Sequence, residues 1–355
     1  MLLLSQNLFS KNERPFKIGI IGLSHSHVHW ILGRANVGDF EIVGIVETDT
    51  ALAKRLMKDY NINKNILYSD IQEMVKKKTP EAVTAFGSIY NHLEVVEKCA
   101  PLGIHVMVEK PLAVSFEHAV KMKKLADENN IYLITNYETT WYATNHKAYS
   151  IVNDENKIGE LRKIIVNDGH KGPKEIGVNK EFLDWLTDPE MNGGGAITDF
   201  GCYGANLITW LMKGEKPISV TAITQQIKPE IYPKVDDEAT IILEYPKAQG
   251  IIQASWNWPF SRKDMEIYGQ TGYVISENKS ELKTKFNESE KENIIKLESR
   301  NHPYQDPFEF LIALVRNEIT MQPYDLSSLE NNIIVMQILD AARKSAKTGK
   351  RIYLK

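Results

Sequence analysis

The first 136 residues alternate between short apolar stretches typical of strands and amphipathic stretches typical of helices. Strands are predicted at Phe16–Ile21, Glu41–Val46, Glu81–Phe86, Ile104–Glu109 and Ile131–Asn136. Helices are predicted between them, at Val28–Leu32, Thr50–Tyr60, Ser69–Lys78, Asn91–Ala100 and Ser115–Asn129. Strands that are joined by helices of this length run parallel, because each crossover brings the chain back to the same end of the sheet. The pattern therefore predicts an α/β fold with a doubly wound parallel sheet and helices on both faces.

The pattern changes after Asn136, where long alternating strands follow one another with short turns. Strands are predicted at Leu161–Val166, Ile218–Thr224, Glu238–Glu244, Gly250–Trp258, Asp264–Tyr268 and Tyr273–Ser276. Helices are predicted at Trp141–Val152, Ala196–Lys213, Pro307–Glu318 and Leu326–Ala346, with an irregular stretch up to Asn192. Consecutive strands with short turns favour an antiparallel sheet. We therefore predict a second α/β domain with a large open, mainly antiparallel sheet.

The length of the chain indicates two domains, because 355 residues exceed what one hydrophobic core usually supports. We place the first domain at residues 16–138 and the second at 139–355, and the last helices could pack back on the first domain. Residues 1–15 begin with an apolar run that is short and lacks basic residues. They are interpreted as a disordered N-terminus on a cytoplasmic protein, or alternatively as the end of a signal peptide on an exported one.

Charge and hydropathy exclude two classes of partner. The net charge is −3 and no block of like charges occurs, so nucleic acid and anionic membrane surfaces are not expected partners. No apolar run approaches the roughly 20 residues that a membrane-spanning helix needs.

A glycine-containing turn follows the first predicted strand. It reads Gly22-Leu23-Ser24-His25-Ser26-His27 and joins a strand to a helix, as the turn of a dinucleotide site does. Only the first glycine of the usual pattern is present, with Ser24 and His27 at the other two glycine positions. We predict cofactor contacts from Gly22, Ser24, His25, Ser26 and His27, although the turn by itself is a weak signal.

Glu47 stands at the end of the second predicted strand. Its distance from Gly22 is close to the roughly 20 residues that separate the phosphate turn from the acid that binds the adenosine ribose. Thr48 follows it rather than an arginine, so the sequence favours NAD over NADP. The alternative is that Glu47 caps the next helix, a role that Asp49 or Thr50 could fill instead.

Three histidines, His25, His27 and His29, lie close together in the sequence. On a helix only His25 and His29 share a face, and no nearby carboxylate has the spacing to complete a metal site. No metal is therefore expected, and His25 is interpreted as a phosphate or ribose contact.

The stretch Ile104–Pro111 begins as a buried strand and ends in Glu109-Lys110-Pro111. Open α/β sheets bind ligands at the carboxyl ends of their strands, and this stretch puts the Lys110 ammonium there. A second stretch, Gly193-Gly194-Gly195, leads into a predicted helix that carries Asp199 and Tyr203 one turn apart. These three side chains are the candidates for catalysis.

The two stretches together resemble the Gfo/Idh/MocA family, which includes glucose–fructose oxidoreductase, inositol dehydrogenase and related sugar dehydrogenases. The Glu109-Lys110-Pro111 motif is similar to one whose lysine lies beside the nicotinamide. The segment from Gly193 to Tyr203 is similar to the family's Asp-x-x-x-Tyr form. The resemblance implies an N-terminal Rossmann domain, an NAD(P) cofactor and a sugar or polyol substrate.

One family motif is poorly matched here. The Thr-Pro-Asn-x-x-His segment appears as Gly87-Ser88-Ile89-Tyr90-Asn91-His92, in which only the histidine matches. We nevertheless include Gly87, Ser88, His92, Glu109 and Asn136, together with Lys110, among the predicted cofactor contacts. Candidates to stack on a sugar ring are Trp185, Trp256, Trp258, Tyr137 and Tyr142, each of which could equally be a packing residue.

The chemistry expected of these residues is oxidation of a secondary alcohol or reduction of the matching ketone. Lys110 would bind the hydroxyl, and Tyr203 would transfer its proton, helped by a phenol pKa that a neighbouring ammonium lowers. Asp199 would orient the substrate or the lysine, and Glu109 would anchor the end of its strand.

Three hypotheses remain open on the sequence. The first is an NAD-dependent sugar or cyclitol dehydrogenase or reductase, and the second is an NAD-dependent glycosidase that oxidises the sugar transiently. The third is a nucleotide-binding protein without catalysis, which the presence of Lys110, Asp199 and Tyr203 disfavours. An open sheet with one apolar face also predicts a homodimer or homotetramer.

Overall fold

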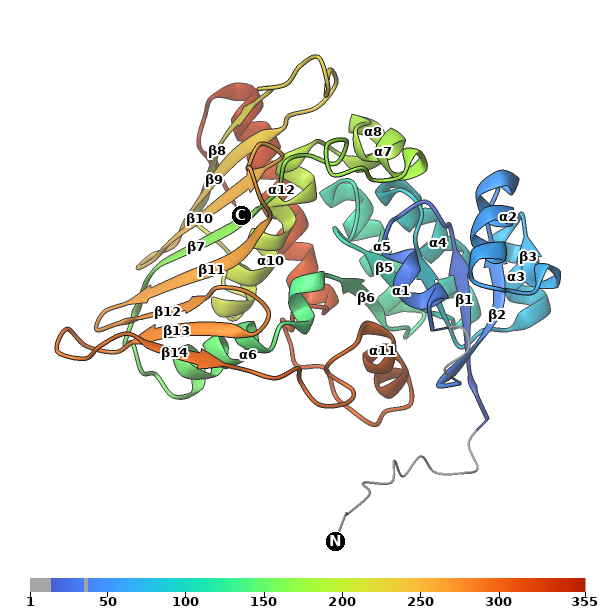
Figure 1. Ribbon diagram of the computed structural model, residues 1–355, viewed down its shortest axis with the longest axis horizontal. Coiled ribbons are helices and arrows are strands. Elements are labelled where there is room, and N and C mark those ends of the chain that lie inside the picture. Colours follow the sequence, from blue (N-terminus) through green and yellow to red (C-terminus); the bar gives the residue numbers. More distant parts are fainter. Residues whose placement is uncertain (1–13, 35–37, 355) are drawn as a thin grey trace, which may run out of the picture.

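A computed structural model describes residues 14–34 and 38–354 of the chain (Figure 1). The interpretation of residues 1–15 as a disordered or exported N-terminus lies almost wholly outside the described residues. Within the described part, no helix combines the length and the apolar character that crossing a membrane requires.

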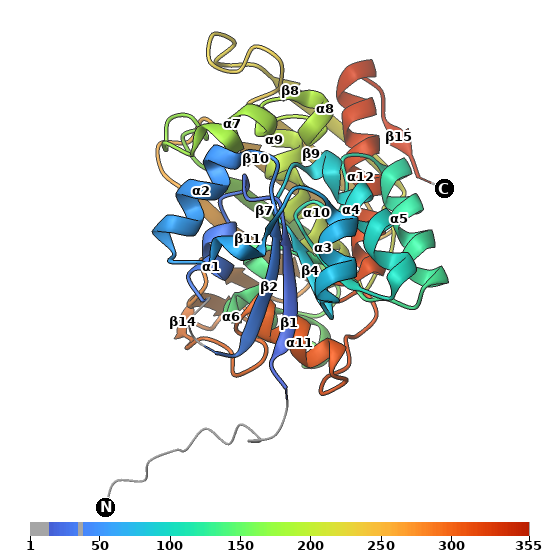
Figure 2. The ribbon, with the colours of Figure 1, turned by 90° about the vertical axis from the view of Figure 1, so that its right-hand side faces the viewer.

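The first sheet has six parallel strands in the order β3-β2-β1-β4-β5-β6. Its strands are β1 Phe16–Ile21, β2 Phe40–Val46, β3 Leu67–Tyr68, β4 Ala82–Ala85, β5 His105–Glu109 and β6 Leu133–Asn136. Its helices are α1 Val28–Leu32, α2 Thr50–Asp59, α3 Ile71–Lys78, α4 His92–Cys99 and α5 Phe116–Glu128. Figure 2 shows α1 and α2 on one side of this sheet and α3, α4 and α5 on the other. The predicted doubly wound sheet is confirmed, and β3 is a short addition to it.

Short single turns connect several of these elements. Three of them are 3-10 turns, at Lys64–Ile66, Ile89–Asn91 and Ala100–Leu102. A fourth, η4 at Glu138–Trp141, follows β6 directly and leads out of the first sheet. A π turn at Ser150–Asp154 ends helix α6, Ala143–Tyr149. Because η4 begins two residues after β6 ends, it lies at the carboxyl edge of the first sheet.

The second sheet has nine strands in the order β14-β13-β12-β11-β7-β10-β9-β8-β15. The strands are β7 Leu161–Gly169, β8 Ser219–Gln225, β9 Glu238–Glu244, β10 Gln249–Ser255, β11 Arg262–Gly269, β12 Tyr273–Ser276, β13 Glu281–Lys285, β14 Asn293–Lys296 and β15 Ile352–Tyr353. All neighbours pair antiparallel except β7 and β10 at the centre, which pair parallel. The predicted mainly antiparallel sheet is confirmed, with one parallel pair that the pattern did not indicate.

Helices cover one face of the second sheet, between it and the first sheet (Figure 1). These helices are α9 Ala196–Asp199, α10 Gly201–Leu211 and α12 Leu329–Thr348. The remaining helices are α7 Lys180–Leu186, α8 Pro189–Asn192 and α11 Pro307–Val315. In α11, Phe308 and Leu311 belong to the same buried cluster as Phe16 and Ile18 of β1, so this late segment packs on the first sheet.

Two local predictions in the second part of the chain are wrong. The stretch before Asn192 was expected to be irregular, but it contains the capped helices α7 and α8, with Asn179 and Asp188 accepting the first free backbone N–H groups. The helix predicted at Ala196–Lys213 is interrupted at Phe200 and forms α9 and α10. The interruption lies between the two candidate residues Asp199 and Tyr203.

Candidate active site

A cleft at the carboxyl edge of the first sheet begins at the turn after β1. Gly22 has a φ of +79°, which favours glycine, and a Cβ there would lie 2.5 Å from the backbone nitrogen of Gly87. The turn after β1 and the turn after β4 therefore touch, and no side chain fits between them. Because no side chain stands where the two turns meet, a ligand can lie along both of them at this edge of the sheet.

The cleft has a volume of about 410 Å³. Six of the predicted cofactor contacts line it, namely Gly22, Ser24, Glu47, Gly87, Ser88 and His92. Glu47 accepts the backbone N–H groups of Leu23 and Asp49, each at 2.8 Å. Asp49, not Glu47, caps α2. The Glu47 carboxylate is therefore held by both flanking turns and lines the cleft, as an acid that receives a ribose would be.

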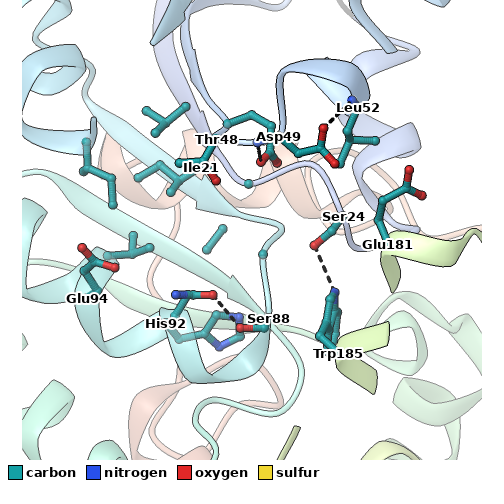
Figure 3. Close-up of a pocket in the computed structure, with 18 of the residues that line it drawn as sticks. Ile21, Ser24, Thr48, Asp49, Leu52, Ser88, His92, Glu94, Glu181 and Trp185 are labelled. Atoms are coloured by element: carbon teal, nitrogen blue, oxygen red, sulfur yellow. Dashed lines mark hydrogen bonds between the residues drawn. The ribbon is translucent and has the colours of Figure 1, made fainter. Parts of the chain in front are cut away.

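Helix α7 reaches the cleft from the second part of the chain. Figure 3 shows Ser24 and Trp185 facing each other, and the Trp185 indole N–H donates to the Ser24 hydroxyl at 3.0 Å. Glu181, one turn earlier, pairs with Arg55 of α2 at 2.9 Å. These contacts make α7 one wall of the cleft, which the prediction of an irregular stretch had missed.

His92 lies at the start of α4 on the floor of the cleft. It is fully buried, and its Nδ1 lies 3.1 Å from the carbonyl oxygen of Leu112. Burial lowers the pKa of His92 to about 4. A neutral imidazole at this position therefore joins the turn after β4 to the segment that follows Lys110.

Two of the histidines meet Glu109, although the sequence offered no carboxylate with metal-site spacing. His27 Nδ1 lies 2.9 Å from Glu109 Oε2, and His25 Nε2 lies 3.9 Å from the same atom. The expectation that no acid completes this group is therefore wrong, because β5 brings an acid from a distant part of the sequence. His25 Nδ1 accepts the backbone N–H of His27 at 3.0 Å. A neutral His25 then carries its proton on the nitrogen that faces Glu109, where a metal would have to bind.

Glu109 has a second partner, Asn136, which is its neighbour on β6. The Asn136 amide donates to Glu109 Oε1 at 2.8 Å, and the Trp141 indole donates to Asn136 Oδ1 at 3.0 Å. Burial would raise the pKa of Glu109, but His27, His25 and Asn136 hold it at about 2. A charged carboxylate with three polar neighbours is thus fixed at the end of β5. Ser26, which lies between the two histidines in the turn after β1, is half-buried.

Lys110 follows β5 and forms an ion pair with Asp199 of α9. Its ammonium donates to Asp199 Oδ1 and, at 3.1 Å, to the Asp199 carbonyl oxygen. The Trp256 indole N–H donates to Asp199 Oδ2 at 3.0 Å. Both charged side chains are buried. Burial alone would lower the pKa of Lys110, but Asp199 raises it, and the ammonium lowers the pKa of Asp199 in return.

Tyr203 lies on α10 beside this pair. The Lys110 ammonium is 5.2 Å from the centre of the Tyr203 ring, so the two residues meet although 93 positions (203 − 110) separate them in the sequence. The expected lowering of the phenol pKa is wrong. Burial raises the pKa of Tyr203 well above 10, and the carboxylates of Glu138 and Asp168 act in the same direction. The resting phenol is therefore a neutral proton donor.

Four polar residues around Tyr203 and the Lys110–Asp199 pair were not predicted from the sequence. They are Glu138 on η4, Asp168 and His170 at the end of β7, and Lys263 on β11. The Lys263 ammonium lies 4.7 Å from the centre of the Tyr203 ring and pairs with Glu138. The strand predicted at Leu161–Val166 stops before Asp168, and the strand predicted at Asp264–Tyr268 starts after Lys263. An acid that follows one predicted strand and a lysine that precedes another were the only sequence features that pointed to these two residues.

The five aromatic candidates for stacking on a sugar differ in their surroundings. Trp256 and Tyr137 are fully buried, and the indole of Trp256 is committed to Asp199, so packing describes them better than stacking. Tyr142 donates to Glu138 at 2.7 Å. Trp258 lies beside Arg262, whose guanidinium carbon is 5.6 Å from the ring centre. Trp185 faces the cofactor turn.

A doubly wound sheet with a cleft at its carboxyl edge, facing a second mixed sheet, defines a two-domain dinucleotide-binding protein. The chain belongs to the Gfo/Idh/MocA oxidoreductase family. The model of the family's NAD-binding Rossmann fold matches residues 16–137, and the model of its C-terminal domain matches residues 147–275. The predicted family and the predicted N-terminal Rossmann fold are therefore confirmed.

Relatives with known activities are distant. The trans-1,2-dihydrobenzene-1,2-diol dehydrogenase of Xenopus tropicalis is 27% identical over 220 residues, which cover 61% of each chain. The D-xylose 1-dehydrogenase [NADP(+)] of Haloarcula marismortui is 24% identical over 236 residues, which cover 66% of this chain and 64% of that protein. The matches thus span less than two thirds of these relatives. Neither name supports the glycosidase alternative.

The fold extends over almost the whole chain. An inositol dehydrogenase homolog from Azotobacter vinelandii, solved with NAD+, matches with a TM-score of 0.81 at 16% identity. The match covers 97% of this chain and 98% of that one. The fold is therefore shared with that structure.

Proposed function

We propose that the protein is an NAD-dependent dehydrogenase or reductase that acts on a secondary alcohol or ketone of a sugar, glycoside or cyclitol. The observation that carries the proposal is the buried group formed by Lys110, Asp199 and Tyr203 at the carboxyl edge of the cofactor sheet. In this proposal residues 16–138 form the cofactor domain and residues 139–355 the substrate and oligomerisation domain.

The cofactor fits the residues that line the cleft. No side chain fits between Gly22 and Gly87, where the two turns touch, and Glu47 supplies a carboxylate for a ribose diol. A 2′-phosphate would lie against that carboxylate, which favours NAD. When bound, NAD accepts or supplies the hydride, and the protein supplies binding, orientation and proton transfer.

The protonation of the site indicates how the residues share the work. Lys110 is held as an ammonium by Asp199, and Tyr203 is held as a neutral phenol by burial. Both groups can donate hydrogen bonds to a substrate oxygen, which stabilises the negative charge that develops there during carbonyl reduction. In the oxidation direction Tyr203 can receive the substrate proton only after its phenol has lost its own proton, and a higher pH favours the phenolate that then acts as the base.

The sheet of the second domain supports a homodimer or homotetramer. Its outer face bears no helix among the described residues (Figure 1). Ile242 of β9 pairs with Ile251 of β10, which pairs with Ile165 of β7, so these side chains form one row on that face. Ile242 is 37% exposed. An apolar row across three strands is a surface that a second copy of the chain could cover.

The test is a screen of NAD reduction, followed at the absorbance of NADH, against a panel of free sugars, cyclitols and glycosides. The proposal predicts turnover of at least one free sugar or cyclitol, and little or none with Lys110→Ala. A wild-type protein that binds NAD but oxidises no member of the panel, and reduces none of the matching ketones, contradicts the proposed function.

A further inference from the structure

Two neighbouring strands place an acid and a base side by side on the inner face of the second sheet. Asp168 of β7 and Lys263 of β11 are directly opposite each other in the antiparallel pair. Residues that face each other in this way project from the same side of a sheet. On β7 that side also carries Ile164 and Val166, which are buried in the core under α10. Asp168 therefore continues the inner face toward Tyr203.

The carboxyl group of Asp168 lacks a partner of its own. Asp168 is 1% exposed, and neither of its oxygens has a hydrogen-bond partner among the described residues. The Lys263 ammonium donates to Glu138 and makes no hydrogen bond to Asp168. Buried polar groups are almost always hydrogen-bonded, and leaving one unpaired costs roughly 1–3 kcal/mol. An unpaired buried carboxyl beside a reaction site is expected to receive its donor from a ligand.

The surroundings of Asp168 identify the kind of donor. Burial raises the pKa of Asp168 well above its ordinary value, and Glu138 and Asp199 act in the same direction, while the ammonium groups of Lys263 and Lys110 act against it. The two ammonium groups balance the carboxylates of Glu138 and Asp199, so these neighbours present no net charge that would favour a cationic or an anionic substituent. A neutral hydroxyl, which can donate to the carboxyl and accept from the ammonium, suits both. Both ammonium groups also lie within 5.2 Å of the centre of the Tyr203 ring, so a second hydroxyl here would be close to the reacting one.

We propose that Asp168, together with Lys263, binds the hydroxyl on the carbon next to the one that is oxidised. The substrate of the reaction proposed above is then a vicinal diol within a sugar or cyclitol. Asp168 acts as a specificity-determining residue, while Lys110 and Tyr203 meet the reacting oxygen. A site that hydrogen-bonds a hydroxyl rejects an analogue without it, because its buried polar groups are then left unpaired. This inference rests on the proposed function.

The experiment compares D-glucose and D-galactose with their 2-deoxy analogues. The C2 hydroxyl neighbours both C1 and C3, so either site of oxidation loses the adjacent hydroxyl in the deoxy sugar. The first readout is kcat/KM for each sugar with NAD. The second is the binding of each sugar, by calorimetry, to the protein saturated with NADH. The wild type should prefer the parent sugar by about 10- to 100-fold, the range expected for loss of a hydrogen bond to a buried polar group.

The variants assign this preference to Asp168. Asp168→Ala should lower kcat/KM for the parent sugar by about 10- to 100-fold and leave the 2-deoxy sugar within about threefold. Asp168→Asn, which has the same shape, should retain part of the preference for the parent sugar over the 2-deoxy sugar. It therefore tests the role of Asp168 even if the alanine variant is unstable. Asn167→Ala is the matched control, because its amide faces the other side of the sheet and donates to Asp264 at 2.8 Å. It should keep the wild-type preference.

Failure of this inference differs from failure of the proposed function. If the wild type oxidises no sugar, cyclitol or glycoside of the panel and reduces none of the matching ketones, the proposed function is contradicted and the role of Asp168 falls with it. If the wild type oxidises the parent and the 2-deoxy sugar equally well, or if Asp168→Ala slows both equally while NAD binding is unchanged, only the vicinal-diol role is overturned.

Discussion

Breaking the Lys110–Asp199 pair should cost far more stability than removing both of its members. In the folded protein each side chain is at most 7% exposed, so either single substitution leaves a buried charge without its partner. Lys110→Met keeps most of the lysine's volume and removes the ammonium. Asp199→Leu removes the carboxylate and also leaves the indole N–H of Trp256 without its acceptor. The two single variants and the double variant together form a thermodynamic cycle.

The magnitudes follow from the burial of the pair. Removing one partner of a buried pair costs roughly 3–5 kcal/mol, whereas replacing both partners by apolar groups is often close to neutral. The unpaired Trp256 N–H adds roughly 1–3 kcal/mol to the Asp199→Leu variant and to the double variant. We therefore expect the double variant to lose about 1–3 kcal/mol in total, well below the sum of the two single losses.

The measurement is urea unfolding of the four proteins without cofactor at pH 7. The pair Lys121→Met and Glu117→Leu is the matched control, because this ion pair on α5 is 53% and 75% exposed. It should change the free energy of unfolding by no more than about 1 kcal/mol and should show little coupling. Single losses that simply add in the Lys110→Met/Asp199→Leu variant would refute the idea that the two charges stabilise each other inside the site.

Three further predictions concern the cofactor, the pH dependence and the assembly. NAD should bind more tightly than NADP by about 1–3 kcal/mol, and Glu47→Ala should narrow the gap; calorimetry that shows equal or tighter NADP binding contradicts this. The folded pKa of His92, about 4, lies below the unfolded value near 6.5. His92 therefore contributes stability above pH 6.5 that is lost as the pH falls toward 4. Urea unfolding should show about 2 kcal/mol of loss between pH 7 and pH 5 that His92→Gln abolishes. Light scattering at micromolar concentration should show at least a dimer, and Ile242→Lys should weaken it; a wild-type monomer counts against the interface.

The parts of the fold that the sequence predicts are those in which local periodicity and packing agree. The first sheet could be predicted from its short apolar segments, because the strands of a parallel sheet are buried on both faces and are apolar along most of their length. The same logic places Lys110 at the carboxyl edge of that sheet, because the edge is the end of β5. The meeting of Lys110 and Asp199 was expected only through the family resemblance, since no periodicity links residues in two domains.

The residues that the sequence analysis missed lie where strands end on polar side chains. β7 continues through Asn167 and Asp168, and β11 begins before Lys263. When burial is inferred from apolar character alone, polar residues such as these are taken to lie outside the strand. An acid and a lysine that face each other on the inner side of a sheet are visible only when the register is known. The expected phenol pKa of Tyr203 failed for a related reason. The sequence shows a neighbouring ammonium, but not the burial and the carboxylates that outweigh it.

The wrong expectation about the histidines and the acid has the same origin. His25 and His27 were judged by their spacing along one helix, whereas Glu109 reaches them from β5. Contacts across a parallel sheet join residues that are far apart in the sequence, so motif spacing cannot exclude them. The start of α9 likewise depends on a tertiary contact, since Gly195 and Ile197 donate their backbone N–H groups to Asp236 of a distant loop.

The most direct test of the proposed mechanism is the steady-state kinetics of Lys110→Ala, Tyr203→Phe and the variant that carries both, on the best substrate of the panel. Each single change should lower kcat by about 10²–10⁴-fold, the range for general acid–base catalysis. NAD affinity and melting temperature should stay near the wild-type values in Tyr203→Phe. If Lys110 and Tyr203 act on one substrate oxygen, the double variant should be little slower than the slower single variant. Losses that multiply in the double variant, or near-normal turnover by Tyr203→Phe, would contradict a shared hydroxyl.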